Sequence, residues 1–172
     1  GNGTKKPFLA KKKFWFHGGS AILSVCVPGQ YEVRMNDRKI SPYVYEGSQT
    51  DFSKHIHYCT YDVAGYMKGG ENELTIECAN GWYIGDDDAG RRYFYTMNAG
   101  YEPFGECLSV IAQLKLDGGY VVTDTTWEVS RSRTVLADIY GSEDMDYTIE
   151  YEWSLAKKAA PPRGKRIPCH YP

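Results

Sequence analysis

The sequence NELTIECANGWYIG, residues 72–85, decides the fold. Its first half alternates apolar and polar side chains, which is the period of a β-strand with one buried face. The Asn-Gly dipeptide at 80–81 breaks this period, and Trp82 and Tyr83 follow where the strand must end. The stretch therefore predicts a half-buried strand that delivers two large rings to a polar loop at the end of a sheet.

Short alternating segments of the same kind recur along the chain. They are residues 14–16, 21–27, 31–35, 54–63, 110–116, 120–129 and 145–153. Turn signals such as Pro28-Gly29, Asn36-Asp37 and Asp117-Gly118-Gly119 separate them. Residues 63–68 have room for one helical turn. Roughly eight to nine short strands with almost no helix predict an antiparallel β-sandwich.

Composition narrows the classes of function. A chain of 172 residues with 42% hydrophobic side chains is long enough for one domain with a real core. Its formal net charge of −2 gives no electrostatic argument for a nucleic-acid partner or an anionic membrane. No apolar run approaches the ~18 residues that a membrane-spanning helix needs, and no signal peptide is predicted at the start. We expect one sandwich domain over residues 1–158, followed by a proline-rich linker over 159–172 that leads to a further domain.

Several short motifs follow one another in an order that is specific even though each motif alone is not. They are YEVRMN at 31–36, TDF at 50–52, YCTYDV at 58–63, GEN at 70–72, GWY at 81–83, AQL at 112–114, DTTW at 124–127 and the segment from DIY at 138–140 to Asp146. In this order the chain resembles the N-terminal β-sandwich domain of bacterial α-L-rhamnosidases, glycoside hydrolase family 78. The resemblance covers about residues 8–172. It departs at SEDMDYT, 142–148, where the family tends to have Gly-Glu-x-Tyr-Asp-Ala-Arg, and at GSQT, 47–50, where it often has Pro-Gly-Trp-Thr.

The resemblance implies a jelly-roll-like, galactose-binding-domain-like sandwich that is an accessory module and not itself an enzyme. Hydrolysis in that family belongs to a separate (α/α)6 barrel, so the implied partner is the catalytic domain of the same parent chain. The module would support the barrel, with its loops over residues 83–104 framing the substrate entrance, and a periplasmic or extracellular location is favoured for the parent. Two alternatives stay open: an autonomous carbohydrate-binding module for rhamnose or rhamnosyl glycans, and an accessory domain of another multi-domain glycoside hydrolase.

The candidate carbohydrate contacts lie where the organising strand ends. Sugar C–H faces stack on aromatic rings, and polar side chains bond the hydroxyls. The candidates are Trp82, Tyr83 and Tyr101 for stacking, and Asp87, Arg91 and Arg92 for hydrogen bonds. The competing interpretation is that Trp82 caps the sandwich and that the tyrosines pack against a neighbouring domain.

A catalytic site within the sandwich is disfavoured. Glycoside hydrolysis needs two carboxyl groups facing each other across a cleft, whereas the consecutive acids Asp86, Asp87 and Asp88 are typical of a solvated loop. Neither GxGxxG nor GxSxG occurs.

Metal binding is also disfavoured, and no cofactor is predicted. His55, His57 and Cys59 would project from one face of a strand, but a fourth zinc ligand is missing. Asn80, Asp86 and Asp88 form a weak candidate for a calcium site. They come from one loop, whereas calcium is coordinated by six or more oxygen atoms from several directions. The five cysteines, at positions 26, 59, 78, 107 and 169, form no CxxC pair, so no disulfide framework is predicted. One disulfide between two of them stays an open alternative.

Overall fold

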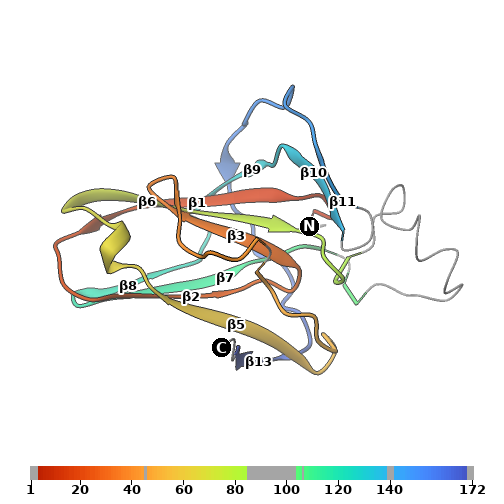
Figure 1. The fold of residues 1–172 in the computed structure, drawn as a ribbon, viewed down its shortest axis with the longest axis horizontal. Coiled ribbons are helices and arrows are strands. Elements are labelled where there is room, and N and C mark those ends of the chain that lie inside the picture. The colour runs from red at the N-terminus through yellow and green to blue at the C-terminus, as the bar shows by residue number, and fades with distance from the viewer. Residues whose placement is uncertain (1–3, 45, 85–103, 106, 139–141, 170–172) are drawn as a thin grey trace, which may run out of the picture.

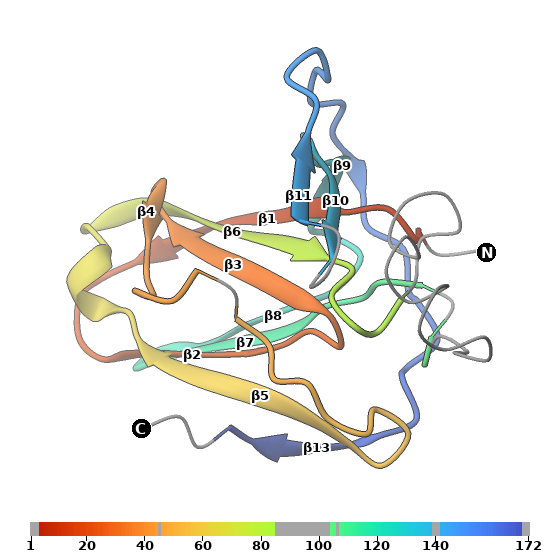
Figure 2. The same cartoon turned by 45° about the vertical axis from the view of Figure 1, so that its right-hand side comes forward.

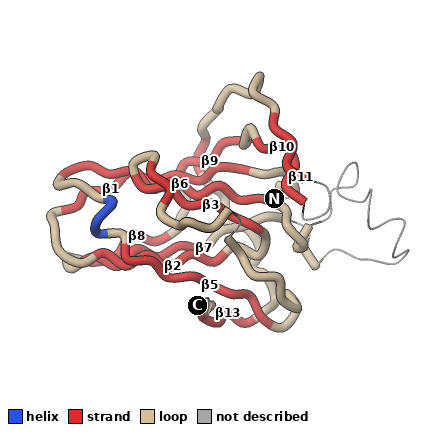
Figure 3. The backbone as a smooth tube through the Cα atoms, in the orientation of Figure 1, coloured by secondary structure: helices blue, strands red, loops and turns tan. Residues whose placement is uncertain are grey.

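The computed structural model describes residues 4–44, 46–84, 104–105, 107–138 and 142–169, with Asp138 and Ser142 described by their backbone alone. Two sheets face each other across one core, and Figure 1 shows them one above the other. Strands dominate, and the helical content of the described residues is one 3-10 turn, η1 (Ala64–Tyr66), as Figure 3 shows. The predicted antiparallel β-sandwich is confirmed.

The upper sheet has six strands in the order β12-β9-β1-β6-β3-β4. Their bounds are β12 (Ser154–Leu155), β9 (Glu128–Arg131), β1 (Phe8–Phe16), β6 (Gly70–Ala79), β3 (Gln30–Met35) and β4 (Arg38–Lys39). The organising strand β6 lies at its centre, antiparallel to both β1 and β3. A separate hairpin, β10 (Thr134–Asp138) and β11 (Ser142–Met145), stands upright against the end of this sheet in Figure 2.

The lower sheet has five strands in the order β13-β5-β2-β7-β8. Their bounds are β13 (Lys165–Pro168), β5 (His55–Asp62), β2 (Ala21–Cys26), β7 (Ile111–Leu116) and β8 (Gly119–Val122). The predicted turn after residue 116 is confirmed between β7 and β8, but the return strand expected over 120–129 ends at Val122, and β9 belongs to the upper sheet. Strand β13 lies parallel to β5, whereas the other strand pairs of this sheet are antiparallel.

Alternation along β6 produces the core as predicted. Leu74, Ile76 and Cys78 are each 0% exposed, and they pack in one apolar cluster with Leu23 of β2 and Leu114 of β7. The intervening side chains of β6 point away from this cluster, because successive residues of a strand face opposite sides.

The turn between β3 and β4 is a two-residue hairpin loop whose residues, Asn36 and Asp37, both have positive φ, at 51° and 62°. This is the geometry of a type I′ turn, which favours Asn followed by Gly. The Asn36 amide also bonds outside the turn: its Nδ2 donates to the Tyr66 carbonyl at 3.1 Å, and its Oδ1 accepts from the Glu73 N–H at 3.1 Å.

Substitution by glycine should therefore act in opposite directions at the two turn positions. Asp37→Gly should raise the free energy of unfolding by roughly 0.5–1 kcal/mol, because glycine adopts positive φ without steric cost. Asn36→Gly relaxes the same backbone but removes the side-chain bonds, so it should lower the free energy of unfolding. Urea denaturation measures the free energy of unfolding of both variants. Changes of the same sign for the two variants would contradict this view of the turn.

Two expectations about the C-terminal part are corrected. Residues 145–153 do not form one strand: β11 ends at Met145, a turn follows, and Tyr147 is 70% exposed. The alternation is real, but the Asp146 carboxylate accepts bonds from the backbone and hydroxyl of Thr148, and this local turn competes with strand pairing. Residues 159–172 are not wholly a linker, because β13 joins the edge of the lower sheet, where proline is tolerated.

The same Asp-x-Ser/Thr turn occurs at Asp51, Asp124 and Asp146, whose carboxylates accept bonds from the residues two positions on. These hydrogen bonds, first of all those from the Ser and Thr hydroxyls, lower the pKa of all three carboxyls, that of Asp51 to about 2.

The lowered pKa values imply acid sensitivity. A carboxyl whose pKa is lower in the folded state stabilises the fold above its unfolded pKa near ~4, and this contribution is lost as pH falls through the folded pKa. The melting temperature should therefore drop between about pH 4 and pH 2. Asp146→Asn keeps an acceptor but does not titrate, so its melting temperature should fall less steeply over this range. If the melting temperatures of the wild type and this variant fell equally between about pH 4 and pH 2, the lowered pKa of Asp146 would be contradicted.

Candidate functional site

Tyr83, one of the predicted sugar-stacking residues, belongs to a second apolar cluster. This cluster consists of Cys26, Phe52, Ile56, Tyr83, Ile84 and Leu108. The Tyr83 ring is 6% exposed and meets the Phe52 ring edge-on, with centroids 5.3 Å apart. Burial raises the pKa of the Tyr83 hydroxyl. The ring therefore packs within this chain, and the two predicted roles of Tyr83, stacking on a sugar and packing against a neighbouring domain, both stay predictions.

The remaining predicted sugar contacts are only partly described. Trp82 is half-buried and packs against the same cluster. Asp87, Arg91, Arg92 and Tyr101 lie outside the described residues. The carbohydrate site proposed for these loops therefore stays a prediction.

The metal candidates are not brought together in the part of the chain that the structure describes, which holds no group of three His, Cys, Asp or Glu side chains placed for a metal ion. His55 is exposed, His57 is half-buried and Cys59 is buried. Asn80 is 0% exposed, and its Nδ2 donates to the Lys5 carbonyl at 2.8 Å while its Oδ1 has no partner. Asp86 and Asp88, the other calcium candidates, lie outside the described residues.

The structure shows a pocket that sequence reasoning missed. It has a volume of about 240 Å³ and lies between β5 and the connection that follows β4. Its lining residues are Ile40, Ser41, Pro42, Tyr43, Glu46, Cys59, Thr60, Tyr61 and Cys169. The connection over residues 41–51 carries no hydrophobic period, so the sequence gives no signal that it folds back over a strand.

Among the described residues that line this pocket, Glu46 is the one with a charged side chain, and it is 2% exposed. Its backbone pairs with Tyr31 in an isolated bridge, with N–H to O distances of 3.0 and 3.2 Å, and its carboxylate Oε1 has no partner. The Tyr31 and Tyr61 hydroxyls lie 3.0 Å apart, and burial raises the pKa of both. The described lining of the pocket thus offers one carboxylate among hydroxyls and thiols, whereas glycoside hydrolysis requires two carboxyl groups.

The outer faces of the two sheets differ in chemistry. On the upper sheet, charged side chains pair across strands: Lys13 Nζ lies 3.4 Å from Glu71 Oε1, and Lys39 Nζ lies 2.8 Å from Glu32 Oε2. On the lower sheet, strand register and exposure place four large apolar or aromatic side chains on the outer face. They are Ile22, Ile111, Tyr120 and Val122, which are 36%, 45%, 61% and 45% exposed.

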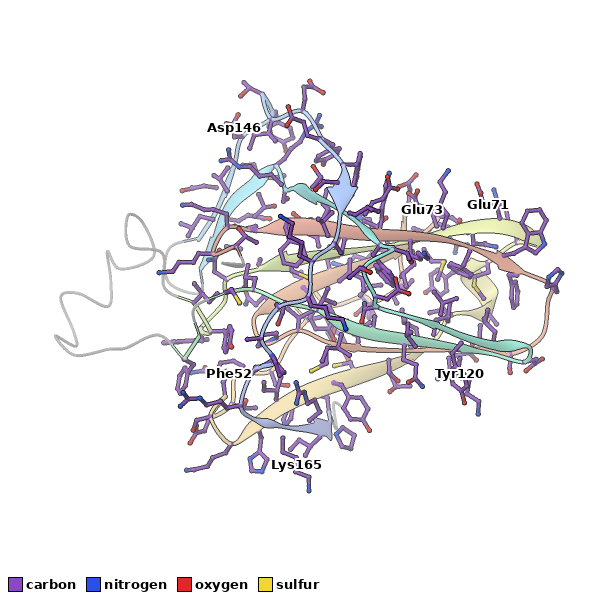
Figure 4. All side chains as sticks on the ribbon, turned by 180° about the vertical axis from the view of Figure 1, so that it is seen from behind. Phe52, Glu71, Glu73, Tyr120, Asp146 and Lys165 are labelled. Atoms are coloured by element: carbon purple, nitrogen blue, oxygen red, sulfur yellow. The ribbon has the colours of Figure 1, made fainter. Side chains whose placement is uncertain are left out.

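Figure 4 shows these two faces on opposite sides of the sandwich, with Glu71 and Glu73 projecting from one and Tyr120 from the other. We call the surface formed by Ile22, Ile111, Tyr120 and Val122 the apolar face. It ends at β8, whose described strand neighbour is β7 alone. Among the described residues, no helix is long and apolar enough to cross a membrane.

Comparison with known proteins places this geometry in a family. Over 156 residues the chain is 26% identical to an α-L-rhamnosidase of Formosa agariphila. The matched region covers 83% of this chain and 16% of that protein. Among solved structures, the α-L-rhamnosidase of Dictyoglumus thermophilum superposes with a TM-score of 0.78 at 23% identity, over 97% of this chain and 19% of that one. The Streptomyces avermitilis α-L-rhamnosidase, solved with L-rhamnose, superposes with a TM-score of 0.75 at 23% identity. This match covers 92% of this chain and 16% of that one.

The chain therefore spans less than a fifth of the length of these relatives. A family model described as the α-L-rhamnosidase N-terminal domain matches residues 19–161, which is most of the chain. The chain belongs to the α-L-rhamnosidase N-terminal domain family.

Proposed function

We propose that this chain is the non-catalytic N-terminal accessory module of an α-L-rhamnosidase and that its apolar face docks against the remainder of the parent polypeptide. The observation that carries the proposal is the contrast between the two outer faces. Large apolar side chains on the outside of a sheet cost solvation free energy in an isolated domain, and clusters of them mark contact surfaces.

The parent polypeptide is the occupant that best fits this face. More than four-fifths of each rhamnosidase relative lies outside the region that this chain matches, so each relative has ample further chain to cover such a surface. The four side chains of the apolar face gather on the neighbouring strands β2, β7 and β8, with Lys115 between Ile22 and Tyr120, and such clusters of exposed apolar side chains mark contact surfaces. Strand β8 also presents one backbone edge, and proteins commonly cover such edges to prevent unwanted pairing.

The assignment of catalysis to another domain rests on the pocket. In the described residues, Glu46 is the single carboxylate of that pocket, and the other polar side chains of its lining carry hydroxyls and thiols. An acid and a base on opposite sides of a sugar ring would need a second carboxyl group there. We therefore expect the parent enzyme to hydrolyse rhamnosides in a separate domain.

Calorimetric titration of this chain with the remainder of its parent, expressed as a separate polypeptide, tests the docking proposal. The wild-type chain should bind, and Tyr120→Glu should weaken the affinity at least tenfold, because an unpaired charge would be buried in the contact. Trp15→Glu is the matched control: Trp15 is also 61% exposed but lies on the upper sheet, so its affinity should change less than twofold. Failure of the wild type to bind, or a larger loss for Trp15→Glu, would overturn the proposal.

A further inference from the structure

Cys59 and Cys169 are brought together by the parallel pairing of β5 and β13. The ladder pairs Lys165 with His55 and continues to the pair of Pro168 with Tyr58. One residue beyond it, the Cys169 N–H donates to the Tyr58 carbonyl at 2.8 Å. This bond keeps the parallel pattern and makes Cys59 the direct neighbour of Cys169.

The same offset occurs at the other end of the ladder, which confirms the register. There the Lys165 N–H donates to the Lys54 carbonyl at 2.8 Å, one residue before its partner His55. Figures 1 and 2 both show β13 running beside β5 along the lower edge of the sandwich. The Cα atoms of in-register neighbours in adjacent strands lie ~4.8 Å apart, and their side chains project from the same face. This spacing falls within the ~4.4–6.8 Å between Cα atoms that a disulfide requires.

The surroundings of the two thiols allow them to react. The two thiols line the same pocket, where the Cys169 Sγ lies 3.2 Å from the Ser48 Oγ. Both cysteines line the pocket; Cys169 is half-buried and Cys59 is 6% exposed, so a small reagent meets Cys169 first. Burial raises the pKa of the Cys59 thiol to about 11, which fits its role as the second thiol to react.

Other described cysteines have no such neighbour across a strand. Cys78 pairs with Phe8 on one side and with Tyr31 on the other, and Cys26 pairs with Ile111. The adjacency of Cys59 and Cys169 is thus specific to the two strands that carry them.

We propose that Cys59 and Cys169 form a disulfide that ties β13 to β5 when the protein meets a disulfide oxidant such as oxidised glutathione. The Cys169 thiolate attacks one sulfur of oxidised glutathione and releases one glutathione thiolate. The Cys59 thiolate then attacks the Cys169 sulfur, and the second glutathione leaves. The protein loses two electrons, one oxidised glutathione becomes two reduced molecules, and the two thiol protons end on these products.

Such a bond would close a loop between residues 59 and 169 that spans most of the sandwich. A cross-link over a loop of this length reduces the conformational freedom of the unfolded chain and should raise the melting temperature by roughly 5–15 °C. It would also hold the edge strand β13 in register while leaving the apolar face free.

The test is incubation of the whole 172-residue chain with oxidised glutathione, followed by alkylation under denaturing conditions and peptide mass mapping. Of the five cysteines, three should remain alkylated, and one peptide should contain Cys59 linked to Cys169. Cys169→Ser should lose both the linkage and the rise in melting temperature, whereas Cys107→Ser should keep both. Cys59→Ala provides a second test at the other partner, and it too should lose the linkage.

The proposal is overturned by five alkylated cysteines after oxidation, by a linkage that involves another cysteine, or by glutathione that stays attached to Cys169. Equal melting temperatures for the oxidised and reduced wild type would overturn the bracing role of the bond. Each of these results is independent of whether the apolar face docks against a parent polypeptide.

Discussion

Leu74→Ala is expected to lower the free energy of unfolding by about 2–5 kcal/mol. Leu74 is 0% exposed at the centre of β6, and its side chain belongs to the cluster that both sheets share. Removing three carbons there loses the transfer free energy of the buried groups and leaves a cavity between two sheets that are each held by backbone pairing. Urea denaturation followed by tryptophan fluorescence and by circular dichroism measures the change.

The matched control for this substitution is Leu155→Ala. Leu155, in β12, is 66% exposed, so the same chemical change should alter the free energy of unfolding by less than about 0.5 kcal/mol. A loss below about 1 kcal/mol for Leu74→Ala, or similar losses for the two variants, would show that β6 does not face the core.

Asn72→Ala should lower the free energy of unfolding by about 2–4 kcal/mol although it removes no apolar contact. The Asn72 side chain is 1% exposed at the start of β6. Its Nδ2 donates to the carbonyls of Lys68 and Gly70 at 2.7 and 2.9 Å, and its Oδ1 accepts from the Lys68 N–H at 3.0 Å and from the Asn36 Nδ2 at 2.8 Å. Alanine would leave these groups without their partner at a position where the Asn72 side chain itself is buried.

A double-mutant cycle with Asn36→Ala separates this network from general disruption. Because the two amides bond each other, their effects should be non-additive by about 0.5–3 kcal/mol. The same cycle between Asn72→Ala and the distant Leu155→Ala should be additive. Additivity for the pair of Asn36 and Asn72 would contradict the network.

The strands that sequence could predict are those whose alternation is matched by burial. β6, β3 and β7 have an inward apolar side and flanking turn residues, so pattern and structure agree. The segment 145–153 shows that alternation alone is insufficient: its tyrosines are exposed, and the Asp146 turn satisfies backbone groups that a strand would otherwise pair.

The candidate site was less predictable because it depends on contacts between distant parts of the chain. Nothing in the composition around Tyr83 distinguishes a ring that stacks on a ligand from one that packs on Phe52. The burial of Glu46 follows from its bridge to Tyr31, and the meeting of Cys59 with Cys169 follows from a parallel pairing across more than a hundred residues. Local periodicity carries no information about such pairings.

Amide hydrogen exchange of this chain, alone and bound to the remainder of its parent, tests the docking account most directly. The backbone edge of β8 that faces away from β7 should exchange quickly in the isolated chain. Binding should slow exchange at Gly119–Val122 and at Ile111–Leu116 and leave Gly70–Ala79 unchanged, since the charged face of β6 would stay in water. Protection centred on Gly70–Ala79, with none at Gly119–Val122, would contradict the account.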